Sequence, residues 1–129
     1  MKSLGRLVLL VQDYDEAIAF YTTKLGFEVV VDIHTGERRC VHLRLPTQPD
    51  VALWLVLAET AAQRAQVGKQ TAGQPYAVFY TDDLAADYDQ LAGKGVEFVR
   101  APVYDITGGV AHFVDLYGNE FVLIELPTL

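Results

Sequence analysis

Residues 7–30 read LVLLVQDYDEAIAFYTTKLGFEVV, and residues 76–99 read YAVFYTDDLAADYDQLAGKGVEFV. Each stretch passes from an apolar run through an acidic residue into an amphipathic run, and then through a glycine into a second apolar run. This order predicts a strand, a capped helix and a strand in both places. The repeat therefore indicates two equivalent modules, and equivalent modules build a site where they meet.

The two predicted helices have clear ends. We expect them at 14–25 and 84–92, where Asp13 caps the first and either Asp82 or Asp83 caps the second. Glycines at the far ends stop both helices. The aromatic and aliphatic residues at helical spacing are expected to pack in the core.

Three strand-like runs follow each helix, so that each module has the order β-α-β-β-β. The predicted strands cover 28–33, 39–45, 51–58, 96–100, 110–114 and 120–126, with turns at 34–37, 47–50 and 115–119. Thr60 and Gln63 have the spacing of a capping box, which predicts the start of a short helix between the modules.

The length of 129 residues indicates a single domain covering 1–129. Module one covers about 1–60, the linker about 61–74 and module two about 75–129. The net charge of −7 argues against binding to nucleic acid or to an anionic membrane. The longest apolar run, 51–58, is too short to span a bilayer, and the N-terminus does not resemble a signal peptide, so we expect a cytoplasmic protein. Cys40 is the single cysteine, which excludes an internal disulfide.

Three segments carry a resemblance to a known family: VQDYDEAIAFYTTKLGFEVV, YTDDLAADYDQLAGKGVEFV and HFVDLYGNEFVLIEL. With the strand order, they resemble the vicinal oxygen chelate superfamily, which includes glyoxalase I, the extradiol dioxygenases and the fosfomycin and bleomycin resistance proteins. The resemblance implies an α+β fold in which two tandem βαβββ modules form a cupped mixed sheet with helices on the outer face. This fold hosts many chemistries, so it does not specify the function.

In the family's enzymes a divalent metal is held by residues from the first and last strands of each module. The matching positions here are Arg6, Ala52 or Trp54, Tyr76, and Val122 with Ile124 or Glu120 as its neighbours in phase. An arginine cannot coordinate a metal, and alanine, tryptophan and valine offer no suitable lone pair. A catalytic metal site needs three protein ligands, so we expect no metal and no other cofactor.

Alternation along the strands predicts instead a mostly apolar ligand pocket with few polar groups. Its expected residues are Arg6, Trp54, Tyr76, Tyr80, His112 and Val122. Arg6 would bind a carboxylate or phosphate, and a planar ring would stack on Trp54. The alternatives are structural: Arg6 as a solvated strand residue, Trp54 as a core or dimer-interface residue, and His112 as an ordinary sheet histidine. His42 is expected to face away from the core, in a structural or exposed position.

Three functional hypotheses follow. The first is a metal-independent protein that binds and sequesters a small, partly apolar molecule and, like the bleomycin resistance branch it resembles, forms a homodimer. The second is a glyoxalase-type lyase or dioxygenase with a displaced metal site, whose suspected ligands are His112, Glu120, Glu125 and His42. The third is a cofactor-free enzyme in which His112 or Tyr76 acts as acid or base and Arg6 stabilises an oxyanion.

Overall fold

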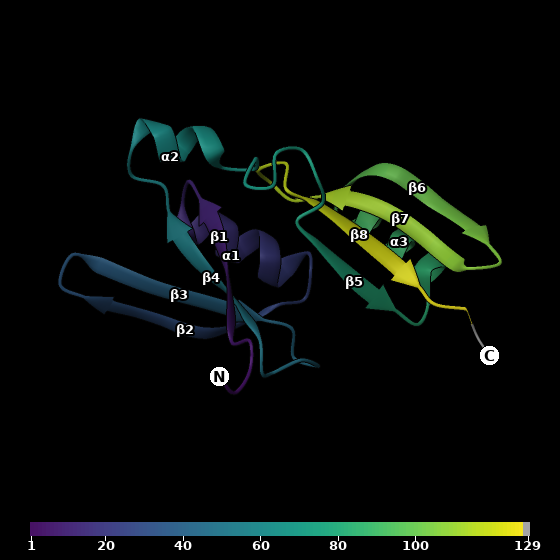
Figure 1. The fold of residues 1–129 in the computed structure, drawn as a ribbon, viewed down its shortest axis with the longest axis horizontal. Helices are drawn as coiled ribbons and strands as arrows, with labels where there is room; N and C mark the ends of the chain where they lie inside the picture. Colours follow the sequence, from purple (N-terminus) through teal and green to yellow (C-terminus); the bar gives the residue numbers. More distant parts are fainter. Residues whose placement is uncertain (128–129) are drawn as a thin grey trace. The chain divides into compact units, whose positions relative to one another are not determined.

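The structure of the protein is a computed structural model that describes residues 1–127 (Figure 1). The chain divides into two compact units, Met1–Val67 and Gly68–Leu129. The first unit contains β1 (Arg6–Val11), α1 (Tyr14–Thr23), β2 (Glu28–Thr35), β3 (Arg38–Arg44), β4 (Ala52–Leu57) and α2 (Ala61–Gln66). The second contains β5 (Ala77–Thr81), α3 (Leu84–Gly93), β6 (Glu97–Asp105), β7 (Gly108–Val114) and β8 (Glu120–Glu125). The predicted order β-α-β-β-β is therefore confirmed in both units.

Each unit has its own four-stranded mixed sheet. The strand orders are β1-β4-β3-β2 and β5-β8-β7-β6, and in each sheet the first and last strands of the unit pair in parallel while the other pairs are antiparallel. This arrangement confirms the α+β fold of two tandem βαβββ modules. Among residues 1–127, none of the helices is long and apolar enough to cross a bilayer.

The core of the first unit lies between its sheet and α1. Five strand residues with no solvent exposure form the sheet's side of this core: Leu9, Val11, Val41, Leu43 and Leu55. Ala17 and Tyr21 of α1 are equally buried. These two helix residues are four positions apart, which places them on one helix face. The predicted apolar stripe of this helix is thus a packing surface.

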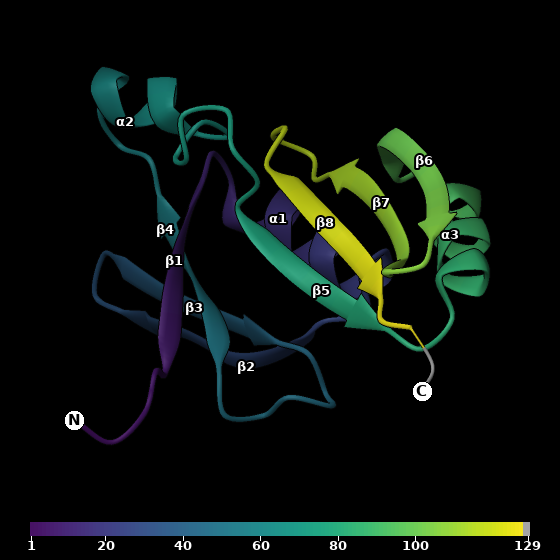
Figure 2. The ribbon, with the colours of Figure 1, turned by 45° about the vertical axis from the view of Figure 1, so that its right-hand side comes forward.

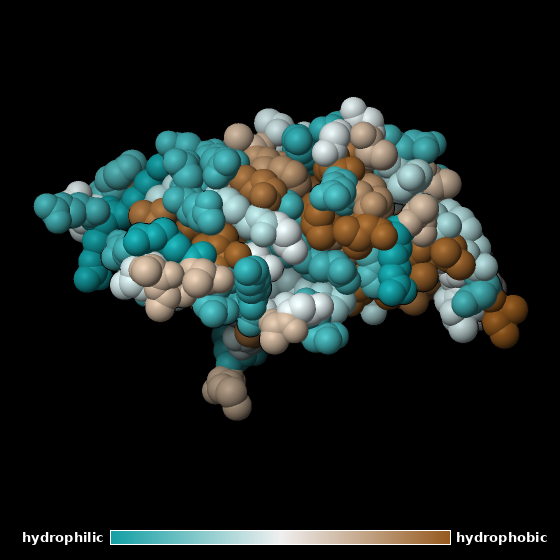
Figure 3. Space-filling model, turned by 90° about the horizontal axis from the view of Figure 1, so that it is seen from above, coloured by the Kyte–Doolittle hydropathy of each residue, from teal (hydrophilic) through white to brown (hydrophobic). Residues whose placement is uncertain are grey.

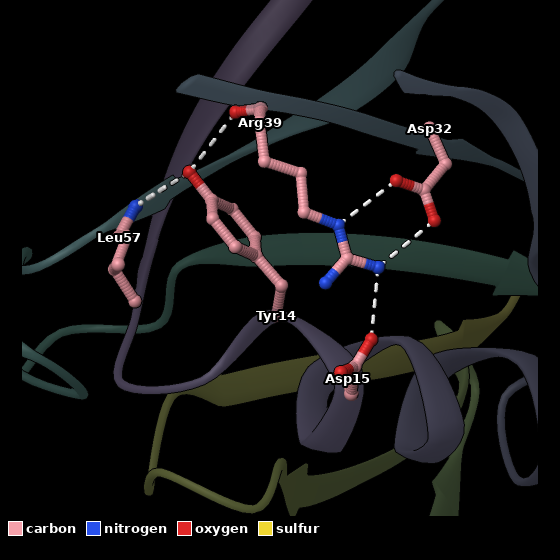
Figure 4. A network of polar contacts seen from close by, with 5 residues as sticks. All are labelled: Tyr14, Asp15, Asp32, Arg39 and Leu57. Atoms are coloured by element: carbon pink, nitrogen blue, oxygen red, sulfur yellow. Dashed lines mark hydrogen bonds and ion pairs between the residues drawn. The ribbon is translucent and has the colours of Figure 1, made fainter. Parts of the chain in front are cut away.

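Polar contacts fix the start of α1 on the sheet (Figure 4). The Asp13 side chain accepts a hydrogen bond from the Glu16 amide, as predicted for the helix cap. The Tyr14 hydroxyl donates to the Arg39 carbonyl and accepts from the Leu57 amide, both at 3.3 Å. It therefore joins the first residue of the helix to two strands.

Arg39 adds charged contacts to the same region (Figure 4). Its guanidinium donates to both carboxylate oxygens of Asp32, each at 2.9 Å, and to Asp15 of α1 at 2.8 Å. The hydrogen bond from Arg39 keeps the pKa of Asp32 below its ordinary value. This arginine is thereby neutralised by carboxylates from a strand and from the helix.

The core of the second unit is aromatic. Phe79, Phe113 and Phe121 have ring centroids 5.1 to 6.1 Å apart, within the range of favourable ring pairs. The helix α3 lies on this side of the sheet and contacts β6, β7 and β8 (Figure 2). Asp83 is its cap, and the Glu125 carboxylate at the end of β8 accepts a further hydrogen bond from the Leu84 amide at 2.8 Å.

Three predicted strands were too short by two or more residues, among them the strand expected at 110–114, which begins at Gly108. The strand expected at 28–33 continues to Thr35, and the strand expected at 96–100 continues to Asp105. In both hairpins the ladder extends to the turn: Thr35 pairs with Arg38, and Asp105 pairs with Gly108. His34 is consequently a strand residue rather than a turn residue. The capping box of Thr60 and Gln63 is confirmed at the start of α2.

A close backbone approach at Gly68 generates a prediction about stability. Gly68 has φ +77°, and a Cβ added there would lie 1.9 Å from the Tyr117 carbonyl oxygen. We expect Gly68→Ala to lower the free energy of unfolding by about 2 to 4 kcal/mol, because it combines a left-handed backbone with a steric clash. Urea unfolding of the two proteins measures this difference.

Gly73 provides the matched control. Its φ is +86°, but an added Cβ would meet nothing within 4 Å. Gly73→Ala should therefore cost only the backbone component, about 1 to 2 kcal/mol. Equal losses in the two variants would show that the approach to Tyr117 is not constraining.

Candidate functional site

One face of the first sheet is turned away from α1 and presents a cation, an imidazole and an indole. The register pairs Val8 with Trp54 and Trp54 with His42, so these side chains lie on one face. Arg6 is two positions before Val8 in β1 and shares that face. Val8 and Trp54 are 42% and 43% exposed. Arg6, Val8, His42 and Trp54 are called the Trp54 face below.

Arg6 and His42 are joined directly across this face. Arg6 Nε donates to His42 Nδ1 at 2.9 Å, and Arg6 Nη1 donates to the Gly5 carbonyl at 2.7 Å. A guanidinium can only donate, so Nδ1 must carry the lone pair and Nε2 the proton. His42 Nε2 lies 3.4 Å from Cys40 Sγ, which is placed to accept that proton's hydrogen bond. The imidazole thus orients the arginine.

The same surroundings keep His42 uncharged. Burial lowers the pKa of His42 below its ordinary value of 6.5, and the positive charge of Arg6 lowers it further. A neutral imidazole at pH 7 can accept the arginine's hydrogen bond, whereas an imidazolium cannot. The face therefore carries one permanent positive charge beside two neutral rings.

The second sheet has a corresponding face turned away from α3. The register pairs Val122 with both Val78 and His112, so His112 and Val122, two of the predicted pocket residues, share this face. Tyr80 lies two residues after Val78 and is 71% exposed. Val78, Tyr80, His112, Val122 and Glu120 are called the His112 face below.

His112 has an acidic partner that the sequence analysis did not assign. Its Nδ1 lies 3.0 Å from Glu120 Oε2, and both side chains are partly exposed. A carboxylate accepts from Nδ1–H, which leaves Nε2 with a lone pair. The arrangement can therefore fix the orientation and the tautomer of the imidazole.

His42 and His112 occupy equivalent positions in the two units. His42 pairs with Trp54 of β4, and His112 pairs with Val122 of β8. Trp54 and Val122 are each three residues before the last residue that pairs in the parallel ladder of their sheet. The antiparallel register reveals this equivalence, which the apolar pattern alone did not. From the sequence, His42 was expected to face away from the core in a structural or exposed position, because it alternates with apolar Val41 and Leu43.

The other predicted residues have these surroundings. The Tyr76 ring packs edge-on against buried Phe121, with ring centroids 5.9 Å apart. Burial, together with the negative charge of Asp115, raises the pKa of Tyr76 to about 12. Its phenol is therefore protonated at neutral pH and can donate a proton but not act as a base. Arg6 and Trp54 are brought together on the Trp54 face, and Tyr80, His112 and Val122 on the His112 face.

The residues proposed for a displaced metal site have different partners. His112 and Glu120 contact one another, but the Glu125 carboxylate caps α3 and His42 accepts from Arg6. Within residues 1–127, no group of three or more His, Cys, Asp or Glu is placed to hold a metal ion. The positions that match the family's metal ligands do not fit a divalent cation either, since Arg6 is itself a cation and Val122 has no lone pair.

Comparison with known proteins identifies the family. The model of the Glyoxalase/Bleomycin resistance protein/Dioxygenase superfamily matches residues 3–123. The chain belongs to this superfamily. Within it, the chain is 38% identical over 127 residues to an uncharacterized protein of Shewanella frigidimarina (strain NCIMB 400), covering 97% of this chain and 94% of that protein.

Two solved structures of high similarity support the fold. The crystal structure of UcmS2 has a TM-score of 0.85 and 32% identity, with 96% of this chain and 98% of that chain covered. TnmS3, an antibiotic binding protein from Streptomyces sp. CB03234, has a TM-score of 0.80 and 24% identity, with 98% of each chain covered. At this identity the similarity to TnmS3 shows the shared fold.

The environment of His42 predicts its titration. In an NMR titration of the imidazole protons, the pKa of His42 should lie below 6.5. It should rise in Arg6→Gln, because that substitution removes the positive charge that helps to lower it. It should stay below 6.5, since burial is the larger cause. Because the pKa of His42 is lower in the folded protein than in the unfolded chain, neutral His42 contributes its full stability above pH 6.5. This contribution is lost as the pH falls through the pKa of the folded protein.

Arg44→Gln is the control for this titration. Arg44 is bonded to Glu28 and is not among the causes of the His42 shift. An unchanged His42 pKa in Arg6→Gln, or an equal change in both variants, would contradict the prediction.

Proposed function

We propose that this protein binds a small, partly apolar molecule through the Trp54 face, without a metal, and sequesters it in the cytoplasm. The observation that carries the proposal is the position of Trp54. Its indole is 43% exposed on a strand whose neighbouring Leu53 and Leu55 are buried. An indole left partly uncovered beside an arginine provides a flat apolar platform with a polar edge, which is typical of a ligand site.

Apolar exposure is not confined to one residue. Val8 on the Trp54 face and Val78 and Tyr80 on the His112 face are each more than 40% exposed. Figure 3 shows hydrophobic residues, in brown, at the surface among hydrophilic ones. On each face the exposed residues are neighbours, since Val8 pairs with Trp54 and Val78 lies two residues before Tyr80, and adjoining apolar residues indicate a binding site more than scattered single residues do.

The family membership supports binding rather than a particular reaction. TnmS3 is described as an antibiotic binding protein, so a chain of this fold can serve as a binding protein. We propose the same general role here. The exposed faces also support a homodimer, and sedimentation velocity at micromolar concentration that shows only a monomer would contradict it.

Loss of the indole should weaken binding. In a thermal-shift screen of polycyclic aromatic compounds, we expect ligands that raise the Tm of the protein. For such a ligand, Trp54→Ala should weaken the affinity at least about ten-fold by isothermal titration calorimetry, because an aromatic contact and its buried area are lost.

Tyr104→Ala is the matched control. Tyr104 is also an exposed aromatic residue, 53% exposed, but it is paired with Gly109 on the side of the sheet that α3 covers. Its replacement should leave the ligand affinity unchanged. Equal effects of the two substitutions would show that Trp54 is not the binding platform.

A second candidate function is a cofactor-free acid–base enzyme, which the His112–Glu120 contact favours. In this candidate, a molecule bound on the His112 face gives a proton to His112 Nε2 while Glu120 orients the ring through Nδ1. Mass spectrometry of each compound that binds shows whether the protein converts it to a product. His112→Gln should then reduce turnover by about 100-fold or more with the affinity retained. Absence of conversion for every binding compound would leave sequestration as the function.

A further inference from the structure

Arg6 is the cation of the Trp54 face, and its hydrogen bonds leave one edge of the guanidinium available. Nε is used by His42, and Nη1 donates to Gly5. Among residues 1–127, Nη2 has no hydrogen-bond partner. A guanidinium has five N–H groups, so three remain, one on Nη1 and two on Nη2, the two nitrogens that form the outer edge of the guanidinium. That edge can hold two oxygens of one carboxylate end-on.

Arg6 also differs from its neighbouring arginines in charge balance. Arg39 is bonded to Asp32 and Asp15, and Arg44 Nε is bonded to Glu28 at 2.8 Å. Within the part of the chain that the structure describes, no carboxylate lies within ion-pair distance of Arg6. An arginine without an acidic partner in a chain of net charge −7 leaves a local positive site for an anion.

The groups around Arg6 hold it in place. The strand residue paired with Arg6 is Ala52, whose small side chain leaves the arginine uncovered by β4. The guanidinium extends across that strand to His42, whose ring centroid is 6.1 Å from that of Trp54. The neutral His42 fixes the guanidinium before any ligand arrives, which reduces the entropy lost on binding.

We propose that the Trp54 face recognises an aromatic carboxylate: the Nη1–Nη2 edge of Arg6 binds the carboxylate, and the ring lies on Trp54. This inference rests on the proposed binding function and adds the chemical class of the ligand. Aromatic area contributes apolar contact, and the charge-assisted pair contributes selection for an anion. An uncharged analogue of the same shape keeps the first contribution and loses the second.

The test compares 2-naphthoate with its uncharged analogue 2-naphthamide, by isothermal titration calorimetry and by fluorescence. Trp54 is the single tryptophan of the chain, so quenching of its emission reports binding at this face. We expect the intact protein to bind naphthoate at least about ten-fold more tightly than naphthamide. The preference should decrease as salt is added, while naphthamide binding stays constant.

Two substitutions on the same sheet separate the roles of the arginines. Arg6→Gln should bring the naphthoate preference to about two-fold or less and leave naphthamide binding unchanged. Arg44→Gln also removes one positive charge, but from an arginine already paired with Glu28, and should leave the preference intact. Arg6 is exposed, so its replacement is expected to keep the fold, which circular dichroism checks.

The outcomes distinguish this inference from the function on which it rests. Equal affinity for the two compounds overturns the carboxylate site, and so does a preference for naphthoate that persists in Arg6→Gln. Either result leaves aromatic binding at the Trp54 face in place. Loss of the preference in Arg44→Gln as well would show a general effect of net charge and also overturn it. If neither compound binds or quenches Trp54, the carboxylate site is overturned together with aromatic binding at this face.

Discussion

The parallel pairing of the first and last strands in each unit is the constraint on which the rest of the structure depends. It aligns Leu9 with Leu55, both fully buried against α1, and thereby aligns Val8 with Trp54 on the other face. Strand residues alternate between faces, so a slip of one position would turn Trp54 into the core and Leu55 to solvent. The exposed indole is thus a direct result of the packing requirement on the opposite side.

Local signals account for most of what the sequence could predict. Asp13 and Asp83 cap helices because short acidic side chains satisfy free backbone amides, and the Thr60–Gln63 pair does so by the same principle. The element order β-α-β-β-β followed from the repeat. The ends of the hairpins were missed for two reasons: His34 and Thr35 beside a tight turn are compatible with both strand and loop, and Pro102 argued against continuing the second strand to Asp105.

Side-chain partnerships were harder to predict than elements. Arg6 and His42 are 36 positions apart, and their contact depends on the register of two strand pairs and on the small size of Ala52 between them. Alternation correctly placed His42 away from the core, but it could not show what the imidazole meets there. The sequence contained Glu120 at a suitable distance from His112 across a predicted hairpin, and that signal was available.

The repeat preserves positions while changing chemistry. The equivalent histidines have opposite proton arrangements, because His42 Nδ1 accepts from an arginine and His112 Nδ1 faces a carboxylate. The hydrogen bond that attaches the start of the helix to the sheet also differs between the two units. In the first unit the Tyr14 side chain accepts from the backbone of Leu57, and in the second the backbone of Leu84 donates to the side chain of Glu125. Leu57 and Glu125 both end the parallel pairing. Each duplicated half can therefore evolve its own way of attaching the helix to the sheet, and a change in one half does not require a matching change in the other.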